Sequence, residues 1–236
     1  MVVAVHQPQY LPWLGYFDKI AACDAFVFLD CVQYKPREFQ NRNKVRTPEG
    51  SKWLSVPVVS KDRGRQIVSE VEIDNDFPWK RQHLNALRSA YGKAAYFDRY
   101  AGFFQELYSG EWNKLMELNV HIIKYLLAEL GIARPVYFES ALGICGTATE
   151  RIIEICQKLN ADTYLSGAGG KDYLAEEKFV PAGIKLLYQE FKHPRYAQQF
   201  MKDENDFIPN LSVLDLLFNE GPNSSKILNL DNKPNT

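Results

Sequence analysis

The residues best suited to chemistry come directly after the first apolar run of the chain. Val2 to Val5 has the length of one buried strand, and His6 and Gln7 follow it at once. In α/β proteins, ligands bind beyond the carboxyl ends of the strands, where an imidazole and a carboxamide can act on them. We therefore predict that His6 and Gln7 are catalytic, with His6 as a general acid or base. The alternative is that both side chains only satisfy buried backbone groups.

Asp30 is a second catalytic candidate, because it closes the next apolar run. Residues 25–30 are typical of another buried strand, and this strand ends in a carboxylate. We predict that Asp30 lies near the end of the first strand, where it orients His6 or holds a ligand hydroxyl. His193 follows the last strand-like run and is a weaker candidate.

A glycine-rich turn after residues 162–165 is a candidate anion-binding site. Three glycines within residues 167–170 let the backbone approach an anion with its N–H groups. The spacing matches neither the P-loop nor the dinucleotide fingerprint, so an ordinary tight turn is the alternative. The predicted ligand-binding residues of the turn are Ser166, Gly167, Gly169, Gly170 and Lys171.

A basic stretch over residues 33–46 is a further candidate. It holds five Lys or Arg residues within twelve positions, mixed with amides and aromatic residues. Arginine grips phosphate through two hydrogen bonds, and amides bind sugar hydroxyls, so a phosphorylated polar ligand is predicted. A solvated basic loop is the alternative. The predicted ligand-binding residues here and in the opening segment are Tyr10, Trp13, Gln33, Tyr34, Arg37, Asn41, Arg42, Asn43 and Lys44.

Composition limits the classes of partner. The 236 residues carry a net charge of -1, so we predict no nucleic-acid partner. Neither a signal-peptide pattern nor an apolar run of roughly 18 residues is present, and we predict a cytoplasmic protein without a membrane span. The four cysteines lack metal-site spacing, so we predict reduced thiols and no metal. The cofactor and the oligomeric state are left open.

The elements that position these residues predict an α/β fold with a mainly parallel sheet. A strand–helix–strand opening like that of Rossmann folds, with its helix at roughly 13–22, begins one domain over residues 1–236. A mostly helical insertion is predicted around residues 77–131, ahead of further strands at 135–138, 162–165 and 184–191. Two strands at 53–59 and 67–73, joined by the loop 60–66, are predicted to form a hairpin.

The end of the chain shows a short helical pattern over residues 211–219, followed from residue 231 by a polar tail that we expect to be frayed. Asp215 and Asn219 lie four residues apart, on one face of this predicted helix. They either contact a ligand or hold neighbouring loops in place, and we favour the second role.

The opening from His6 to Phe17 resembles the start of the WbqC-like protein family. Further agreement lies in residues 30–58, 164–173 and 211–219, so the resemblance covers nearly the whole chain. It implies a place among proteins associated with bacterial O-antigen and other surface-polysaccharide gene clusters. The resemblance does not fix a reaction.

Together, these observations predict an enzyme that transfers an acyl or aminoacyl group to a nucleotide-linked amino sugar. His6 would accept the proton of the attacking amine, while Arg37, Arg42 and Lys44 would hold the diphosphate. The turn at 166–170 would donate backbone N–H groups to phosphate or to an oxyanion. The alternatives are a nucleotidylyltransferase-like nucleotide-binding enzyme and a non-catalytic scaffold of a polysaccharide assembly complex.

Overall fold

The computed structural model describes residues 1–230 and contains a five-stranded sheet in the order β5-β2-β1-β6-β7. All neighbouring strands of this sheet run parallel, which confirms the predicted mainly parallel α/β fold. The strands are β1 (Val2–His6), β2 (Ala25–Phe28), β5 (Val136–Phe138), β6 (Thr163–Ser166) and β7 (Lys185–Tyr188).

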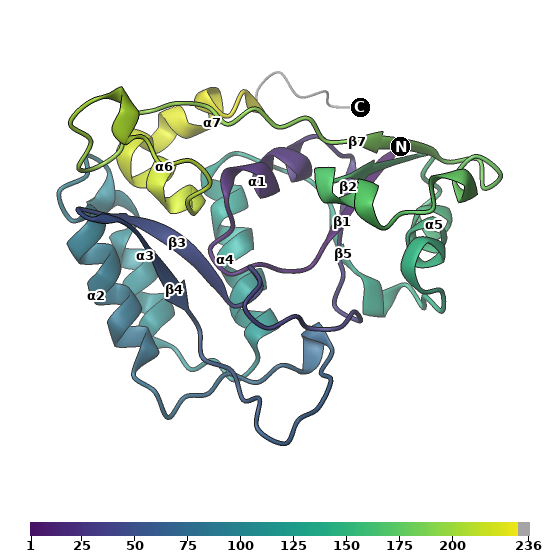
Figure 1. Cartoon of the computed structure of the whole chain (residues 1–236), viewed down its shortest axis with the longest axis horizontal. Helices are drawn as coiled ribbons and strands as arrows, with labels where there is room; N and C mark the ends of the chain where they lie inside the picture. Colours follow the sequence, from purple (N-terminus) through teal and green to yellow (C-terminus); the bar gives the residue numbers. More distant parts are fainter. Residues whose placement is uncertain (231–236) are drawn as a thin grey trace.

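Helices cover both faces of the sheet, and this explains why the central strands are apolar runs rather than alternating patterns. Phe26 and Phe28 belong to one hydrophobic core, whereas Val3 and Val27 belong to a second core on the opposite face. Figure 1 shows α5 (Ala148–Lys158) on one side of the sheet, with α1 (Leu14–Ala21) and α4 (Leu115–Glu129) on the other. The predicted opening strand, helix and second strand are thus confirmed.

The order of the strands places a topological switch point between β1 and β6. From β1 the chain passes through α1 to β2 on one side, while β6 pairs with β1 on the other side. Connections that leave in opposite directions open a crevice at the carboxyl ends of such strands. His6 ends β1 and Ser166 ends β6, so both lie at this crevice.

The segment predicted to be mostly helical contains α2 (Trp79–Tyr91), α3 (Phe97–Ser109) and α4. Gly131 follows α4 with a φ of 70°, the left-handed conformation that commonly ends a helix. Side chains of these helices join those of the sheet in one hydrophobic core. The single domain over residues 1–236 stays a prediction.

The predicted hairpin is wrong in position. The observed hairpin pairs β3 (Arg42–Thr47) with β4 (Gly50–Ser55), and it turns at Pro48 and Glu49. Gly50 has a φ of 126°, which side-chain-bearing residues rarely adopt, so this turn fixes the register. Downstream, the predicted second strand contains the short helical turn η1 (Val68–Glu70), and only a bridge joins Val58 to Ile73.

The C-terminal helical pattern forms α6 (Val213–Glu220), followed by α7 (Ser224–Ile227). The predicted frayed tail from residue 231 lies outside the described residues. No helix within residues 1–230 has both the length and the apolar character that a membrane crossing needs. The remaining short helical turns are η2 (Glu139–Ala141), η3 (Ala168–Asp172), η4 (Glu176–Lys178), η5 (Glu204–Asp206) and η6 (Gly221–Asn223).

Candidate functional site

A cavity of about 820 Å³ lies at the carboxyl ends of β1 and β6. This volume is in the range of small-molecule sites, and the position is the switch point of the sheet. We call this cavity the large hollow. Among its lining residues are His6, Gln7, Gln9, Lys19, Gln33, Lys35, Gln40, Arg151, Tyr164, Gly167, Gly169, Gly170 and Tyr173.

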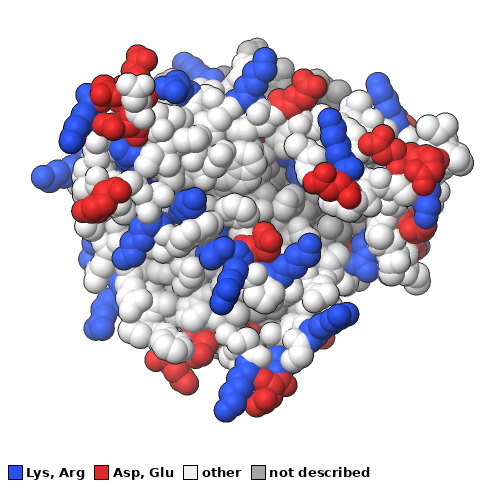
Figure 2. Space-filling model, in the orientation of Figure 1, with Lys and Arg blue, Asp and Glu red and all other residues white. Residues whose placement is uncertain are grey.

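A second cavity of about 460 Å³, the small hollow, shares part of its wall with the large one. Both cavities are lined by His6, Lys19, Gly167 and Gly169. The small hollow continues towards residues 189–192. Figure 2 shows several Lys and Arg side chains, with Asp or Glu side chains among them, around a recess near the middle of one face of the molecule.

His6 is partly buried, and its environment keeps the imidazole neutral. Its Nδ1 lies 3.1 Å from the carbonyl oxygen of Gln7; a proton on Nδ1 would leave Nε2 as an acceptor. Burial, assisted by the nearby positive charge of Lys19, lowers the pKa of His6 from 6.5 to about 3. The ring also packs edge-on against Tyr16, with 5.2 Å between the ring centroids.

Lys19 is a site residue that the sequence analysis missed. It projects from α1, is only 3% exposed, and donates a hydrogen bond from Nζ to the carbonyl oxygen of Val5 at 3.0 Å. Burial lowers its pKa from 10.5 to about 8. None of the ion pairs among residues 1–230 involves Lys19.

In the glycine-rich turn, Gly167 and Gly169 line both hollows together with His6, whereas Ser166 lines neither. A Cβ on Gly170 would lie 2.0 Å from the Ser166 hydroxyl oxygen, so this close approach requires glycine. Ser166 itself is fully buried, and its hydroxyl donates to the carbonyl oxygen of Gly167 at 3.0 Å. Lys171 lies elsewhere, with Nζ 5.1 Å from the centre of the Tyr188 ring.

The basic stretch reaches the large hollow with other residues than those predicted to hold phosphate. Alternation along β3 puts Arg42 and Lys44 on one face of the hairpin, above the ring of Trp53 at 4.2 and 5.0 Å. Arg37 is exposed, and its carbonyl accepts a hydrogen bond from Arg42. None of these cations lines either hollow, so the predicted diphosphate grip is not formed there.

Buried amides on the same stretch hold the backbone together. The Asn43 side chain donates to the carbonyl oxygen of Leu11 at 2.8 Å, and Asn41 donates to that of Val56 at 2.9 Å. Tyr34 is buried away from both hollows. Of the predicted residues in this stretch, only Gln33 lines the large hollow.

The two aromatic residues predicted from the opening segment have different surroundings. Tyr10 is fully buried, and its hydroxyl is hydrogen-bonded to His83 at 2.7 Å and to Tyr108 at 2.6 Å. It therefore belongs to the contact with α2 and α3 rather than to a cavity. Trp13 lines the small hollow and packs edge-on against Phe191.

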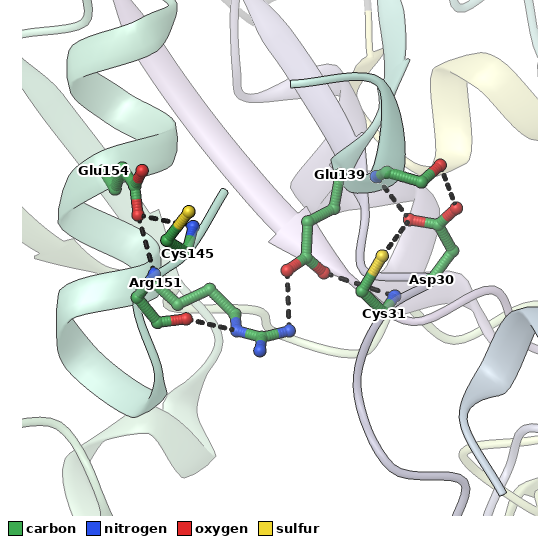
Figure 3. A network of polar contacts seen from close by, with 8 residues as sticks. Asp30, Cys31, Glu139, Cys145, Arg151 and Glu154 are labelled. Atoms are coloured by element: carbon green, nitrogen blue, oxygen red, sulfur yellow. Dashed lines mark hydrogen bonds and ion pairs between the residues drawn. The ribbon is translucent and has the colours of Figure 1, made fainter. Parts of the chain in front are cut away.

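Asp30 is held by a network next to the large hollow instead of orienting His6. Its carboxylate accepts hydrogen bonds from the Ser140 amide at 3.0 Å and the Ser140 hydroxyl at 2.6 Å. Glu139 accepts from Arg151 at 2.6 Å, which fixes this cavity-lining arginine (Figure 3). Ligand atoms of Asp30, Cys31 and Glu139 lie within 4.8 Å of one another, but the carboxylate oxygens already accept hydrogen bonds.

Other lining residues that the sequence analysis missed are Gln9, Lys35, Gln40 and Arg151. Gln9 and Gln40 lie close to predicted residues in sequence, so extending the two candidate segments would have found them. The signal for Lys19 was its place in an amphipathic helix directly after the first strand end. Arg151 carries no local signal, because it comes from α5, far along the chain.

Fold and geometry together define an α/β protein with a cavity at the switch point of a parallel sheet. The chain belongs to the WbqC-like protein family, whose model matches residues 7–227. It is 34% identical over 220 residues to the uncharacterized protein Rv1507c of Mycobacterium tuberculosis, a match that covers 93% of this chain and 94% of the relative. No solved structure matches the chain.

Proposed function

We propose that this protein is an enzyme of bacterial surface-polysaccharide biosynthesis that transfers an acyl or aminoacyl group to a nucleotide-linked amino sugar. The pathway part of the proposal rests on the family resemblance. The ligand class rests on the cavity, whose walls combine three cations and several carboxamides with one acid; the charged residues are Lys19, Lys35, Arg151 and Glu38. Cations suit phosphate, and carboxamides suit sugar hydroxyls and nucleobase edges.

The observation that carries the proposal is the meeting of two hollows at His6. A transfer between two ligands requires that the reacting atoms be held next to each other, since this proximity supplies a large part of the rate acceleration. The large hollow has room for a nucleotide-linked sugar, and the small hollow for part of an activated acyl donor such as a thioester. Their shared wall at His6 and Gly167 is where the two would meet.

In this scheme the amine of the sugar attacks the carbonyl carbon of the donor. The new C–N bond forms as the bond to the leaving group breaks, and His6 moves the amine proton to the leaving group. The pKa of about 3 makes His6 a weak base in the empty cavity. A phosphate bound nearby would raise this pKa, because negative charge stabilises the imidazolium.

The test is a thermal-shift and product assay with nucleotide sugars, nucleotide amino sugars, coenzyme A thioesters and ATP, alone and in pairs. A ligand at 100 times its Kd stabilises the fold by about 2.7 kcal/mol, which is readily measured. We expect a nucleotide amino sugar to raise the Tm, and mass spectrometry to detect its acylated form when the thioester is added.

The variants His6→Ala and Arg42→Ala separate the site from the rest of the surface. We expect His6→Ala to lower the transfer rate at least 100-fold with little change in Tm, and Arg42→Ala to keep wild-type activity. Full activity of a folded His6→Ala protein would contradict the role of His6. Pyrophosphate release from ATP without acyl transfer would favour the nucleotidylyltransferase-like alternative, and the absence of any ligand effect would favour the scaffold.

A further inference from the structure

Lys19 carries a buried charge that forms no ion pair with any residue of 1–230. Its side chain lines both hollows, is 3% exposed, and makes one hydrogen bond within the described part of the chain, to a neutral carbonyl oxygen. Lysine is almost never buried to this extent unless it is paired, because removing an ammonium from water is costly.

The surroundings of Lys19 come from β1, from the turn after β6 and from its own helix. From β1 it meets the Val5 carbonyl and the neutral ring of His6, and from the turn after β6 it faces Gly167, where a Cβ would lie 3.8 Å from Nζ. On its own helix, the Asp18 carboxylate accepts a hydrogen bond from Gln189 at 2.7 Å. An anion that enters the hollows would therefore be the natural partner of the ammonium.

Gln9 supplies an independent observation in the same cavity. Its side chain is 6% exposed and lines the large hollow, and its Oε1 accepts no hydrogen bond from residues 1–230. Leaving a buried carbonyl oxygen without a donor destabilises the folded protein. A ligand that donates a hydroxyl or N–H to Gln9 would remove this cost.

We propose that Lys19 is the anchor for a phosphate oxygen of the ligand and that Gln9 accepts a hydrogen bond from a hydroxyl or N–H of the same ligand. The ligand is thus a phosphorylated molecule with a donor-rich part, such as a sugar phosphate or nucleoside diphosphate. This deepens the proposed function, and rests on it for the choice of phosphate over carboxylate. The phosphate lies where the hollows meet, and the donor-rich part extends into the large hollow.

The first test measures how inorganic pyrophosphate protects Lys19 from acetylation in the wild-type protein, with Lys171 as an internal reference. The exposed Lys171 lines neither hollow. We expect pyrophosphate to slow the acetylation of Lys19 at least tenfold and to leave that of Lys171 unchanged. Equal effects at the two lysines, or protection of Lys19 by acetate but not by pyrophosphate, would overturn the proposal.

The second test compares Lys19→Met with the matched control Lys171→Met in titrations with pyrophosphate and uridine diphosphate. Because Lys19→Met removes an uncompensated buried charge, we expect it to fold with a Tm at or above that of the wild type. Its Kd for both probes should rise at least tenfold, whereas Lys171→Met should bind as the wild type does. Unchanged affinity of the folded Lys19→Met protein would overturn the proposal. If this variant does not fold, the acetylation test still decides, because it uses the wild-type protein.

Gln9→Leu tests the second contact. It should weaken uridine diphosphate at least threefold but leave pyrophosphate unchanged, since only the former carries ribose hydroxyls and a uracil N–H. Equal losses for both probes would contradict the role of Gln9. These outcomes are separable from the proposed function: phosphate binding at Lys19 without any acyl transfer would refute the reaction and keep this site. Acyl transfer by the wild type together with unchanged binding by Lys19→Met would refute this site and keep the reaction.

Discussion

Two buried polar clusters in this protein differ in how many of their polar atoms have hydrogen-bond or charge partners. In the helical part, the Asp215 carboxylate accepts hydrogen bonds from Tyr91 at 2.9 Å, Tyr196 at 2.9 Å and Gln198 at 2.8 Å. At the switch point, Lys19 has one neutral acceptor and Gln9 Oε1 has no donor within residues 1–230. A satisfied cluster needs nothing from outside, whereas an unsatisfied cluster beside a cavity is suited to a ligand.

The contacts of Asp215 and Asn219 explain the role of this pair. Asp215 is fully buried and connects α6 to α2 and to the segment 196–198, and Asn219 binds Gln199 at 2.8 Å. Both residues thus hold neighbouring segments in place, which is the role that the sequence analysis favoured. Burial still raises the pKa of Asp215 to about 6, although its three donors act in the opposite direction.

The largest expected effect on stability comes from removing the Asp215 carboxylate from its hydrogen-bonded cluster. Asp215→Ala leaves the hydroxyls of Tyr91 and Tyr196 without their acceptor and removes one of the two acceptors of the Gln198 amide, so we expect a loss of about 4 kcal/mol in the free energy of unfolding. Urea denaturation measures this loss. The exposed Glu111→Ala serves as control and should change stability by less than about 0.5 kcal/mol. A loss below about 1 kcal/mol in Asp215→Ala would contradict the conclusion that the hydrogen bonds of this cluster stabilise the fold.

His83 gives a pH-dependent effect of somewhat smaller size. Burial lowers the pKa of His83 from 6.5 to about 4, while its Nδ1 stays hydrogen-bonded to Tyr10. The neutral ring therefore contributes stability that is complete above pH 6.5 and is lost as the pH falls towards 4, by about 3 kcal/mol in total. We expect His83→Gln, which cannot titrate, to show a flatter loss of stability over this range. Parallel curves for the two proteins would contradict this assignment.

The smallest effect is expected at the hairpin, where the predicted phosphate-binding cations pack on Trp53. Trp53→Ala removes two exposed cation–aromatic contacts worth about 0.5–1 kcal/mol each at most. We expect a decrease in Tm of a few degrees and an unchanged Kd for uridine diphosphate, because these residues lie outside both hollows. A tenfold higher Kd would show that the basic stretch takes part in binding.

Much of the fold could be predicted because burial imposes a pattern on the residues themselves. The uninterrupted apolar run at β2 identified a strand covered on both faces, and the helical spacing before Gly131 identified α4. The hairpin was misplaced because the strand β3 is rich in polar residues: its Arg46 is buried, yet its side chain donates to carbonyls of residues 199 and 206. Such long-range partners leave no local signal.

The sequence by itself determined where the first strand ends, and hence that His6 and the turn at 166–170 lie at the same edge of a parallel sheet. Only the tertiary structure decided which polar side chains there are left without partners. Tyr10 is hydrogen-bonded to His83, 73 residues away, whereas Lys19, nine residues further along, bonds only to a carbonyl among residues 1–230. Spacing reports which residues are buried, but satisfaction depends on contacts between distant segments, and those exist only once the chain has folded.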